Sequence, residues 1–76
     1  MTNTELLRKK IDDSGYKLVF LAEKCGLTYN GLLKKLKGET EFKAPEMAVL
    51  KDQLNLDADD MEAIFFAADV DKTSTT

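Results

Sequence analysis

A single glycine, Gly26, separates two short amphipathic segments, and this spacing constrains the fold more than any other feature of the sequence. Before the glycine, apolar residues recur with the i, i+3, i+4, i+7 spacing of one buried helical stripe. These residues are Leu18, Leu21, Ala22 and Cys25. After it, Leu27 and Leu32 occupy the two positions of a hydrophobic staple, and Thr28 can cap a second helix. Two helices joined by so little chain must cross at a steep angle.

Each residue type in this pair of helices meets a steric demand. Ala22 is expected where the helices approach most closely, and Gly26 is expected in a left-handed conformation that other residues adopt only at a cost. A set of small and apolar residues would hold the pair on the core. The predicted set is Leu21, Ala22, Gly26, Leu27, Leu32 and Leu36. The opposite face of the second helix is then exposed, and a helix fits the major groove of DNA, which is about 12 Å wide.

The segments on either side of this pair also have helical periodicity. A helix over residues 3–14 is predicted, with a capping box formed by Thr2 and Glu5. Residues 39–44 are predicted to form a charged loop whose Phe42 packs into the core. No alternating stretch bounded by turn residues indicates a strand.

Two more helices complete the predicted bundle. Pro45 fits the first turn of a fourth helix that ends near Asn55, and Asp57 can cap a short fifth helix. The predicted fold class is therefore an all-α, compact five-helix bundle with a helix-turn-helix at its second and third helices. We expect one domain over residues 1–68, followed by a flexible tail over residues 69–76 that has little to bury.

Charge is distributed unevenly along the chain. The formal net charge is −3, but residues 1–43 hold nine lysines or arginines against six acids, whereas residues 44–76 hold two against eight. A chain polarised in this way can turn a basic face to phosphate and an acidic face to solvent. An asymmetry of this size also arises by chance, so charge alone leaves both interpretations open.

Residues that carry reaction chemistry are scarce. The sequence has no histidine and one cysteine, Cys25, which excludes an internal disulfide and a cysteine-built metal site. Nothing near Cys25 activates it, so we expect a small buried hydrophobic side chain. We predict no enzymatic activity, no cofactor, no metal and no small-molecule substrate. Because no apolar run reaches about 20 residues and no charged-then-apolar leader opens the chain, we expect a cytoplasmic protein without a membrane partner.

Residues 21–28 (LAEKCGLT) and the closing Lys37-Gly38 resemble the helix-turn-helix of the Cro/C1-type family, the phage repressor-like or Xre proteins. The resemblance runs from about Leu6 to Met61, and residues 54–57 (LNLD) are similar to the family's link between its fourth and fifth helices. Other stretches look most like small phage or prophage members; they are residues 16–18 and 41–43. The resemblance implies a lambda-repressor-like five-helix bundle whose third helix reads double-stranded DNA as a homodimer, at least when bound.

The sequence departs from the family pattern in two places. Gly31 lies inside the recognition helix, where it costs up to about 1 kcal/mol of helix propensity. Pro45 follows Gly38 later than is usual in the family, with Phe42 in the intervening loop.

The resemblance and the helical positions together assign residues to a DNA site. The predicted base-reading residues are Thr28, Tyr29, Asn30 and Leu33. The predicted phosphate-binding residues are Lys17, Lys34, Lys37 and Lys43. Each assignment has a plainer alternative: Thr28 and Asn30 as cap and turn residues, Leu33 as partly buried core, and the lysines as a solvated face.

The predicted function is that of a sequence-specific transcriptional repressor. The alternative is a protein-interaction module, an antitoxin or antirepressor, that keeps the fold but turns the acidic C-terminal half toward a basic partner. For the homodimer, we expect a seam on the fifth helix at Met61, Phe65 and Phe66, since a domain of this size rarely buries three such residues in its terminal helix.

Overall fold

The computed structural model describes residues 2–66 of the chain, and every regular element in this part is a helix. The five helices are α1 (Thr4–Ser14), α2 (Leu18–Cys25), α3 (Tyr29–Leu36), α4 (Ala44–Leu54) and α5 (Ala58–Met61). α5 continues directly into a π-helical segment, Glu62–Phe66. The predicted all-α, five-helix bundle is confirmed, whereas the predicted flexible tail over residues 69–76 lies outside the described residues.

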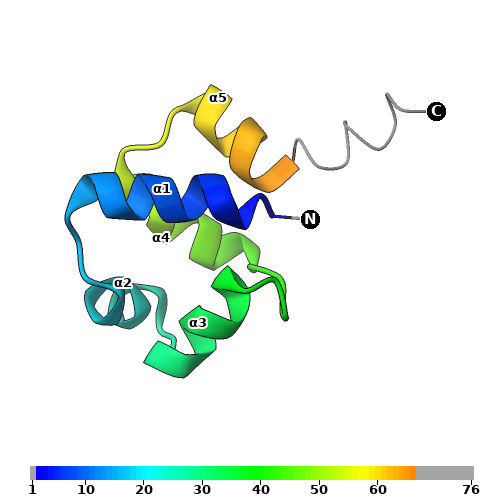
Figure 1. The fold of residues 1–76 in the computed structure, drawn as a ribbon. Helices are drawn as coiled ribbons and strands as arrows, with labels where there is room; N and C mark the ends of the chain where they lie inside the picture. Colours follow the sequence, from blue (N-terminus) through cyan, green and yellow to red (C-terminus); the bar gives the residue numbers. More distant parts are fainter. Residues whose placement is uncertain (1, 67–76) are drawn as a thin grey trace.

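The helices are arranged around α1 and α4, which cross near the middle of the molecule (Figure 1). α2 and α3 lie together at one end of the bundle, and α5 lies at the opposite end (Figure 1). α2 packs against both α3 and α4, while α1 packs against α3, α4 and the π-helical segment. The helix pair around Gly26 therefore forms one whole end of the protein. None of the helices in residues 2–66 is both long and apolar enough to cross a membrane.

The start of α1 differs from the prediction. Asn3, not Thr2, is the N-cap residue, and its side-chain oxygen accepts a hydrogen bond from the Leu6 N–H at 3.1 Å. The capping box expected from Thr2 and Glu5 is therefore wrong. Asparagine is favoured over threonine as an N-cap residue, and the Asn3 N–H also donates to the Ile64 carbonyl oxygen, which holds the chain at this residue.

The boundaries of α4 and α5 follow local sequence signals. Asn55 ends α4 in a left-handed conformation (φ 54°), which asparagine tolerates better than most residues. Asp57 and Asp60 form a reciprocal capping box, in which each carboxylate accepts from the other's backbone N–H. The predicted exit of α4 at Asn55 and the predicted cap at Asp57 are confirmed.

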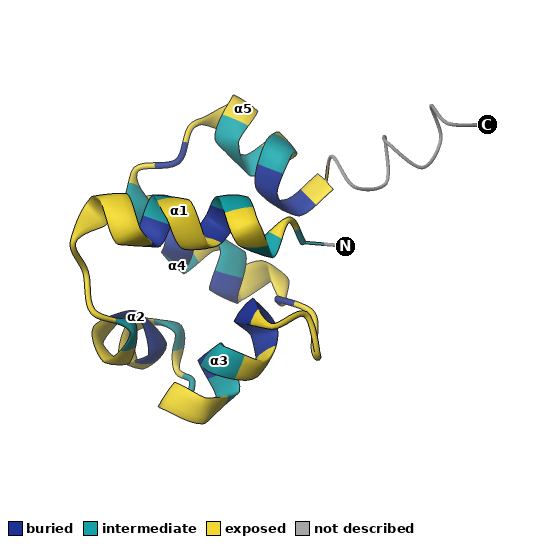
Figure 2. Ribbon diagram, in the orientation of Figure 1, coloured by how far each residue is buried: buried dark blue, intermediate teal, exposed yellow. Residues whose placement is uncertain are grey.

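The core is built from apolar residues on the inward sides of the helices (Figure 2). Its buried members are Leu7, Ile11, Leu21, Ala22, Leu32, Leu36, Phe42, Leu50, Leu56, Ile64 and Phe65. Phe42 packs into it as predicted, and its ring lies edge-on to that of Phe65 at 5.9 Å between centroids. Phe65 is thus a core residue and not part of the seam expected with Met61 and Phe66, because its ring is buried against the loop that carries Phe42.

Candidate nucleic-acid interface

The turn between α2 and α3 consists of Gly26, Leu27 and Thr28. Gly26 has φ +73°, a left-handed conformation in which a side chain would be strained. The Leu27 N–H donates to the Ala22 carbonyl oxygen at 2.8 Å, so an otherwise unpaired carbonyl at the end of α2 is satisfied. The tight turn sets the direction in which α3 leaves the bundle.

Buried apolar side chains hold this pair of helices on the core. Leu21 and Leu32 have no exposed surface, and Ala22 is almost completely buried. Leu36 is also buried, and Leu27 is partly buried against the same cluster. α3 is therefore anchored along one side, and this leaves its other side at the surface.

The outward side of α3 carries Tyr29, Asn30 and Lys34, all of which are exposed. Tyr29 is 48% exposed, and Leu33, one turn further along, is partly buried. Lys37 at the C-cap is exposed and continues the same row at i, i+4, i+8 from Tyr29. Four of the predicted contact residues therefore share one surface, with Leu33 at its edge.

Thr28 is the N-cap residue of α3. Its hydroxyl oxygen accepts a hydrogen bond from the Gly31 N–H at 2.9 Å. The sequence left both a capping and a base-reading role open for this residue, and the structure assigns the oxygen to the cap. The hydroxyl hydrogen can still be donated outward, since Thr28 is exposed.

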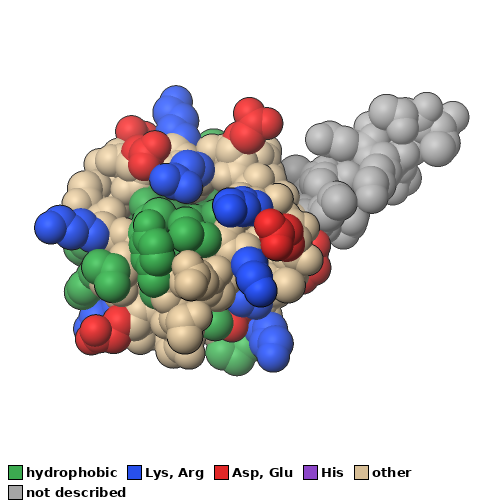
Figure 3. All heavy atoms as spheres, turned by 60° about the horizontal axis from the view of Figure 1, so that its bottom comes forward, with side chains coloured by type: hydrophobic (Ala, Val, Ile, Leu, Met, Phe, Trp, Pro, Cys, Tyr) green, Lys and Arg blue, Asp and Glu red, His purple; other side chains and the backbone are tan. Residues whose placement is uncertain are grey.

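The predicted phosphate-binding lysines come from different elements. Lys34 and Lys37 belong to α3, whereas Lys17 and Lys43 are the N-cap residues of α2 and α4; all four are exposed. Figure 3 brings the end of the molecule with α2 and α3 forward; a group of hydrophobic side chains lies there beside several lysine or arginine side chains, with acidic side chains farther out. This end of the bundle presents both positive charge and apolar surface.

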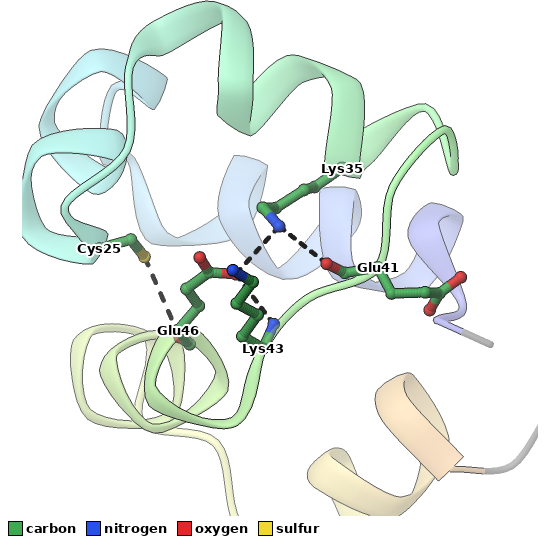
Figure 4. A network of polar contacts seen from close by, with 5 residues as sticks. All are labelled: Cys25, Lys35, Glu41, Lys43 and Glu46. Atoms are coloured by element: carbon green, nitrogen blue, oxygen red, sulfur yellow. Dashed lines mark hydrogen bonds and ion pairs between the residues drawn. The ribbon is translucent and has the colours of Figure 1, made fainter.

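Lys35 does not belong to that surface, although in the sequence it lies between the exposed Lys34 and Lys37. Its ammonium lies 3.2 Å from Glu46 Oε1 and donates to the Glu41 carbonyl oxygen at 2.8 Å (Figure 4). The same Glu46 oxygen accepts the Lys43 backbone N–H at 2.9 Å. Both charged side chains of the pair are about nine-tenths buried. Sequence reasoning missed this pair, although position 35 falls on the buried side of the helix between Leu32 and Leu36.

Cys25 lies beside this ion pair. Its Sγ is 4.0 Å from the Glu46 carbonyl oxygen, and the residue is partly buried against the core. Burial raises the pKa of the thiol, the Glu46 carboxylate raises it further, and the Lys35 ammonium lowers it. The thiol therefore stays protonated at neutral pH, as expected of a small hydrophobic side chain rather than a nucleophile.

An apolar strip begins just before α2, continues along the outer side of its first turn, and was not predicted. It consists of Tyr16, Val19 and Phe20, of which Val19 is the most exposed, at 58%. The rings of Tyr16 and Phe20 stack at 5.1 Å between centroids, and the Lys24 ammonium lies 5.4 Å from the Phe20 centroid. The signal in the sequence was that Val19 and Phe20 are apolar but fall outside the buried stripe of α2.

Within residues 2–66, no group of three or more histidine, cysteine, aspartate or glutamate side chains is placed to hold a metal ion. Comparisons with protein-family models, with curated proteins and with solved structures find no match for this chain. The resemblance to the Cro/C1-type family therefore stays a prediction from the motif residues.

Proposed function

We propose that this protein is a sequence-specific double-stranded DNA-binding transcriptional regulator that inserts α3 into the major groove. The observation that carries the proposal is the division of α3 into two sides. Leu32 and Leu36 are buried, whereas Tyr29 and Asn30 are exposed at the N-terminal end. In helix-turn-helix proteins it is the N-terminal residues of the second helix that contact base edges.

The exposed side chains divide naturally into two roles. Asn30 can pair with adenine through two hydrogen bonds, while Tyr29 and Leu33 can contact base edges without charge. Lys34 and Lys37 would bind phosphates and position the helix without reading sequence. Lys17 and the first amide groups of α2 would add a phosphate contact on the other helix, and Lys43 another beyond the loop.

The buried position of Lys35 changes the expected electrostatics. Its charge is neutralised by Glu46 inside the bundle, so it does not contribute a phosphate contact. The proposed phosphate-binding lysines Lys17, Lys34, Lys37 and Lys43 would supply four phosphate contacts in one subunit. With a slope of about 0.9 per phosphate contact, the log of the affinity should fall by roughly 3.6 per bound subunit, or roughly 7.2 for a dimer, per tenfold rise in salt.

A homodimer on a two-fold symmetric site is part of the proposal. Of the residues expected at a seam, Phe65 is buried, Met61 is partly buried and Phe66 is 45% exposed. Phe66 is therefore the residue that a partner subunit would contact on this helix. Half-sites one helical turn apart, about 34 Å, would place both α3 helices in successive major grooves.

We propose a cytoplasmic repressor of the phage or prophage kind that carries no catalytic activity.

The test is selection of bound sequences from a random duplex pool. Enrichment of a palindromic site that binds about 10³-fold or more tighter than random duplex supports sequence reading by a dimer. Equal binding to all duplexes, or no binding at low salt, contradicts the proposal. Lys51→Met, which removes an exposed lysine from α4 and leaves the proposed contact lysines in place, is a control for nonspecific charge effects.

The apolar strip of Tyr16, Val19 and Phe20 favours a second candidate, a protein-interaction module of the antitoxin or antirepressor kind. Exposed apolar side chains that are grouped on one surface often mark a protein contact. The substitution Val19→Ser separates the candidates. It should weaken capture of a protein partner, whereas a DNA reader that uses α3 should keep its preference for the selected site.

A further inference from the structure

The chemistry of the outward side of α3 is more specific than its shape. Its first two turns carry an aromatic ring, an amide and an aliphatic side chain, from Tyr29, Asn30 and Leu33. Tyr29 and Leu33 are at i and i+4, so their Cβ atoms are neighbours about 5–6 Å apart, with Asn30 beside them. Of the charged side chains on this side, Lys34 follows Leu33 in the second turn and Lys37 is the C-cap residue.

Base pairs differ in what they offer such a surface. In the major groove guanine presents two acceptors, which are met best by arginine or lysine. Adenine presents an acceptor and a donor, which match an asparagine amide, and thymine presents a C5 methyl group, which matches an apolar side chain. The only arginine of the chain is Arg8 on α1, which belongs to neither helix of the pair.

The first turn of α3 is also held in a defined geometry. Thr28 caps it by accepting from the Gly31 N–H, and the Leu32 N–H donates to the Thr28 carbonyl oxygen at 3.0 Å. Leu32 is fully buried and fixes the rotation of the helix about its axis. Tyr29 and Asn30 therefore project from a backbone whose orientation is set before any ligand binds.

We infer that the base pairs under the first two turns of α3 are A·T pairs, read by Asn30 on adenine and by Tyr29 and Leu33 on thymine methyl groups. This inference rests on the proposed function and adds the class of site that α3 reads. Burial of one methyl group contributes about 0.8 kcal/mol, which corresponds to about a fourfold change in affinity.

Replacing thymine by uracil tests the inference, because it removes the methyl group and leaves every hydrogen-bonding group in place. In the selected duplex, each thymine is replaced in turn by deoxyuridine, and the affinity of the unmodified protein is measured. We expect about fourfold weaker binding at one or more thymines next to the adenine whose preference is relaxed by Asn30→Ala. Thymines outside the segment that α3 contacts should tolerate uracil without loss.

Variants connect each methyl group to a side chain. Tyr29→Ala and Leu33→Ala should each reduce the uracil effect to less than twofold at one position, because the apolar partner of that methyl is gone. Lys34→Ala is the matched control, since it should weaken thymine and uracil duplexes equally. Leu33 is partly buried, so thermal unfolding of Leu33→Ala is measured as well. The results with Tyr29→Ala and with the unmodified protein do not depend on whether Leu33→Ala folds.

The outcomes separate this inference from the proposed function. Failure to enrich any duplex removes both. An enriched site with G·C pairs where Asn30→Ala acts, or a uracil duplex bound as tightly as its thymine parent, overturns the inference and leaves sequence-specific binding intact. A change of base preference in Lys34→Ala would also overturn it, because lysine would then be reading guanine.

Discussion

Lys35 and Glu46 join the last turn of α3 to the first turn of α4 through an ion pair of 3.2 Å that is closed off from solvent. Glu41 and Lys43, which flank Phe42 in the connecting loop, supply further hydrogen bonds to this pair through their backbone groups. The Lys35 ammonium also lies 5.9 Å from the centre of the Phe42 ring. A few side chains therefore fix the loop that follows α3, and with it the C-terminal end of the helix that we propose enters DNA.

The first prediction concerns this pair. Lys35→Met leaves the Glu46 carboxylate buried without its partner and should lower the free energy of unfolding by about 3–5 kcal/mol. A chain of this length has a total stability of roughly 4–11 kcal/mol, so the variant should be largely unfolded on mild warming. Urea denaturation followed by circular dichroism measures the change.

Two further variants control this experiment. Lys35→Met combined with Glu46→Met should be more stable than Lys35→Met alone, because no unpaired charge remains. Lys34→Met, at an exposed neighbouring position, should change stability by about 0.5 kcal/mol or less. A Lys35→Met variant as stable as the parent would mean that Glu46 reaches water.

The second prediction concerns the contact between α2 and α3. Ala22 is almost completely buried where the pair packs on the core, so Ala22→Leu should destabilise the protein by about 1–3 kcal/mol through overpacking. Val19→Leu enlarges an exposed side chain on the same helix and should have little effect. If both variants melt at the parent temperature, the helices do not approach closely at Ala22.

Much of this architecture was predictable because its signals are local. The stripe through Leu21 and Ala22, the hinge at Gly26 and the cap at Thr28 depend on residues within one or two turns of each other. The pairing of Lys35 with Glu46 spans eleven positions and joins two helices, so it cannot be predicted from the periodicity of either helix. A lysine between two buried leucines indicates that a partner is needed, but it does not say which one.

The structure also differs from the sequence predictions at the cap of α1 and at the apolar strip beside α2. Asn3 caps α1 with its own side chain, and a backbone hydrogen bond to Ile64, more than sixty residues away in the sequence, also holds the chain at this residue. The apolar strip on α2 could be recognised as lying off the buried stripe, but its exposure depends on which surfaces α1 and α4 leave uncovered. For the candidate site, the exposure of Tyr29 and Asn30 follows from the local pattern, whereas the removal of Lys35 from the basic surface does not.

The third prediction separates base reading from phosphate binding. Asn30→Ala should relax base preference at one position, with a loss of about 1–3 kcal/mol on the selected site and little on random duplex. Lys34→Ala should weaken binding to all duplexes alike and reduce the salt slope by about 0.9 per bound subunit. Fluorescence anisotropy over a salt series measures both. Equal losses on specific and random DNA for both variants would contradict the division of roles.

The fourth prediction concerns pH. The backbone N–H of Asp57 and the ammonium of Lys10, 3.2 Å from Asp60 Oδ1, hold the pKa of the Asp60 carboxyl below its ordinary value. The folded protein therefore binds this proton less readily than the unfolded chain. The resulting stabilisation is fully present above about pH 4 and is lost as the pH falls through the lower pKa of the folded state.

Asp60→Asn should accordingly be less stable than the parent at neutral pH, with a difference that shrinks on acidification. Urea titrations between pH 7 and pH 2 measure the free energy of unfolding of both proteins. Asp59→Asn removes the same charge from the adjacent position. The difference in free energy of unfolding between this variant and the parent should change less with pH. A difference between Asp60→Asn and the parent that is constant over the whole range would contradict the argument.

The last prediction concerns Gly31, whose place inside α3 looks unfavourable from helix propensity alone. A Cβ atom at this position would lie 3.0 Å from the Thr28 hydroxyl oxygen, the same atom that accepts the Gly31 N–H. Gly31→Ala gains up to about 1 kcal/mol of helix propensity but must displace the cap, which contributes about the same amount. We therefore expect almost no net change in stability. In a Thr28→Ala background the cap is already absent, so Gly31→Ala should then stabilise the protein by up to about 1 kcal/mol. A double-mutant cycle measures this coupling. Additive effects would show that the Thr28 cap does not explain the glycine at position 31.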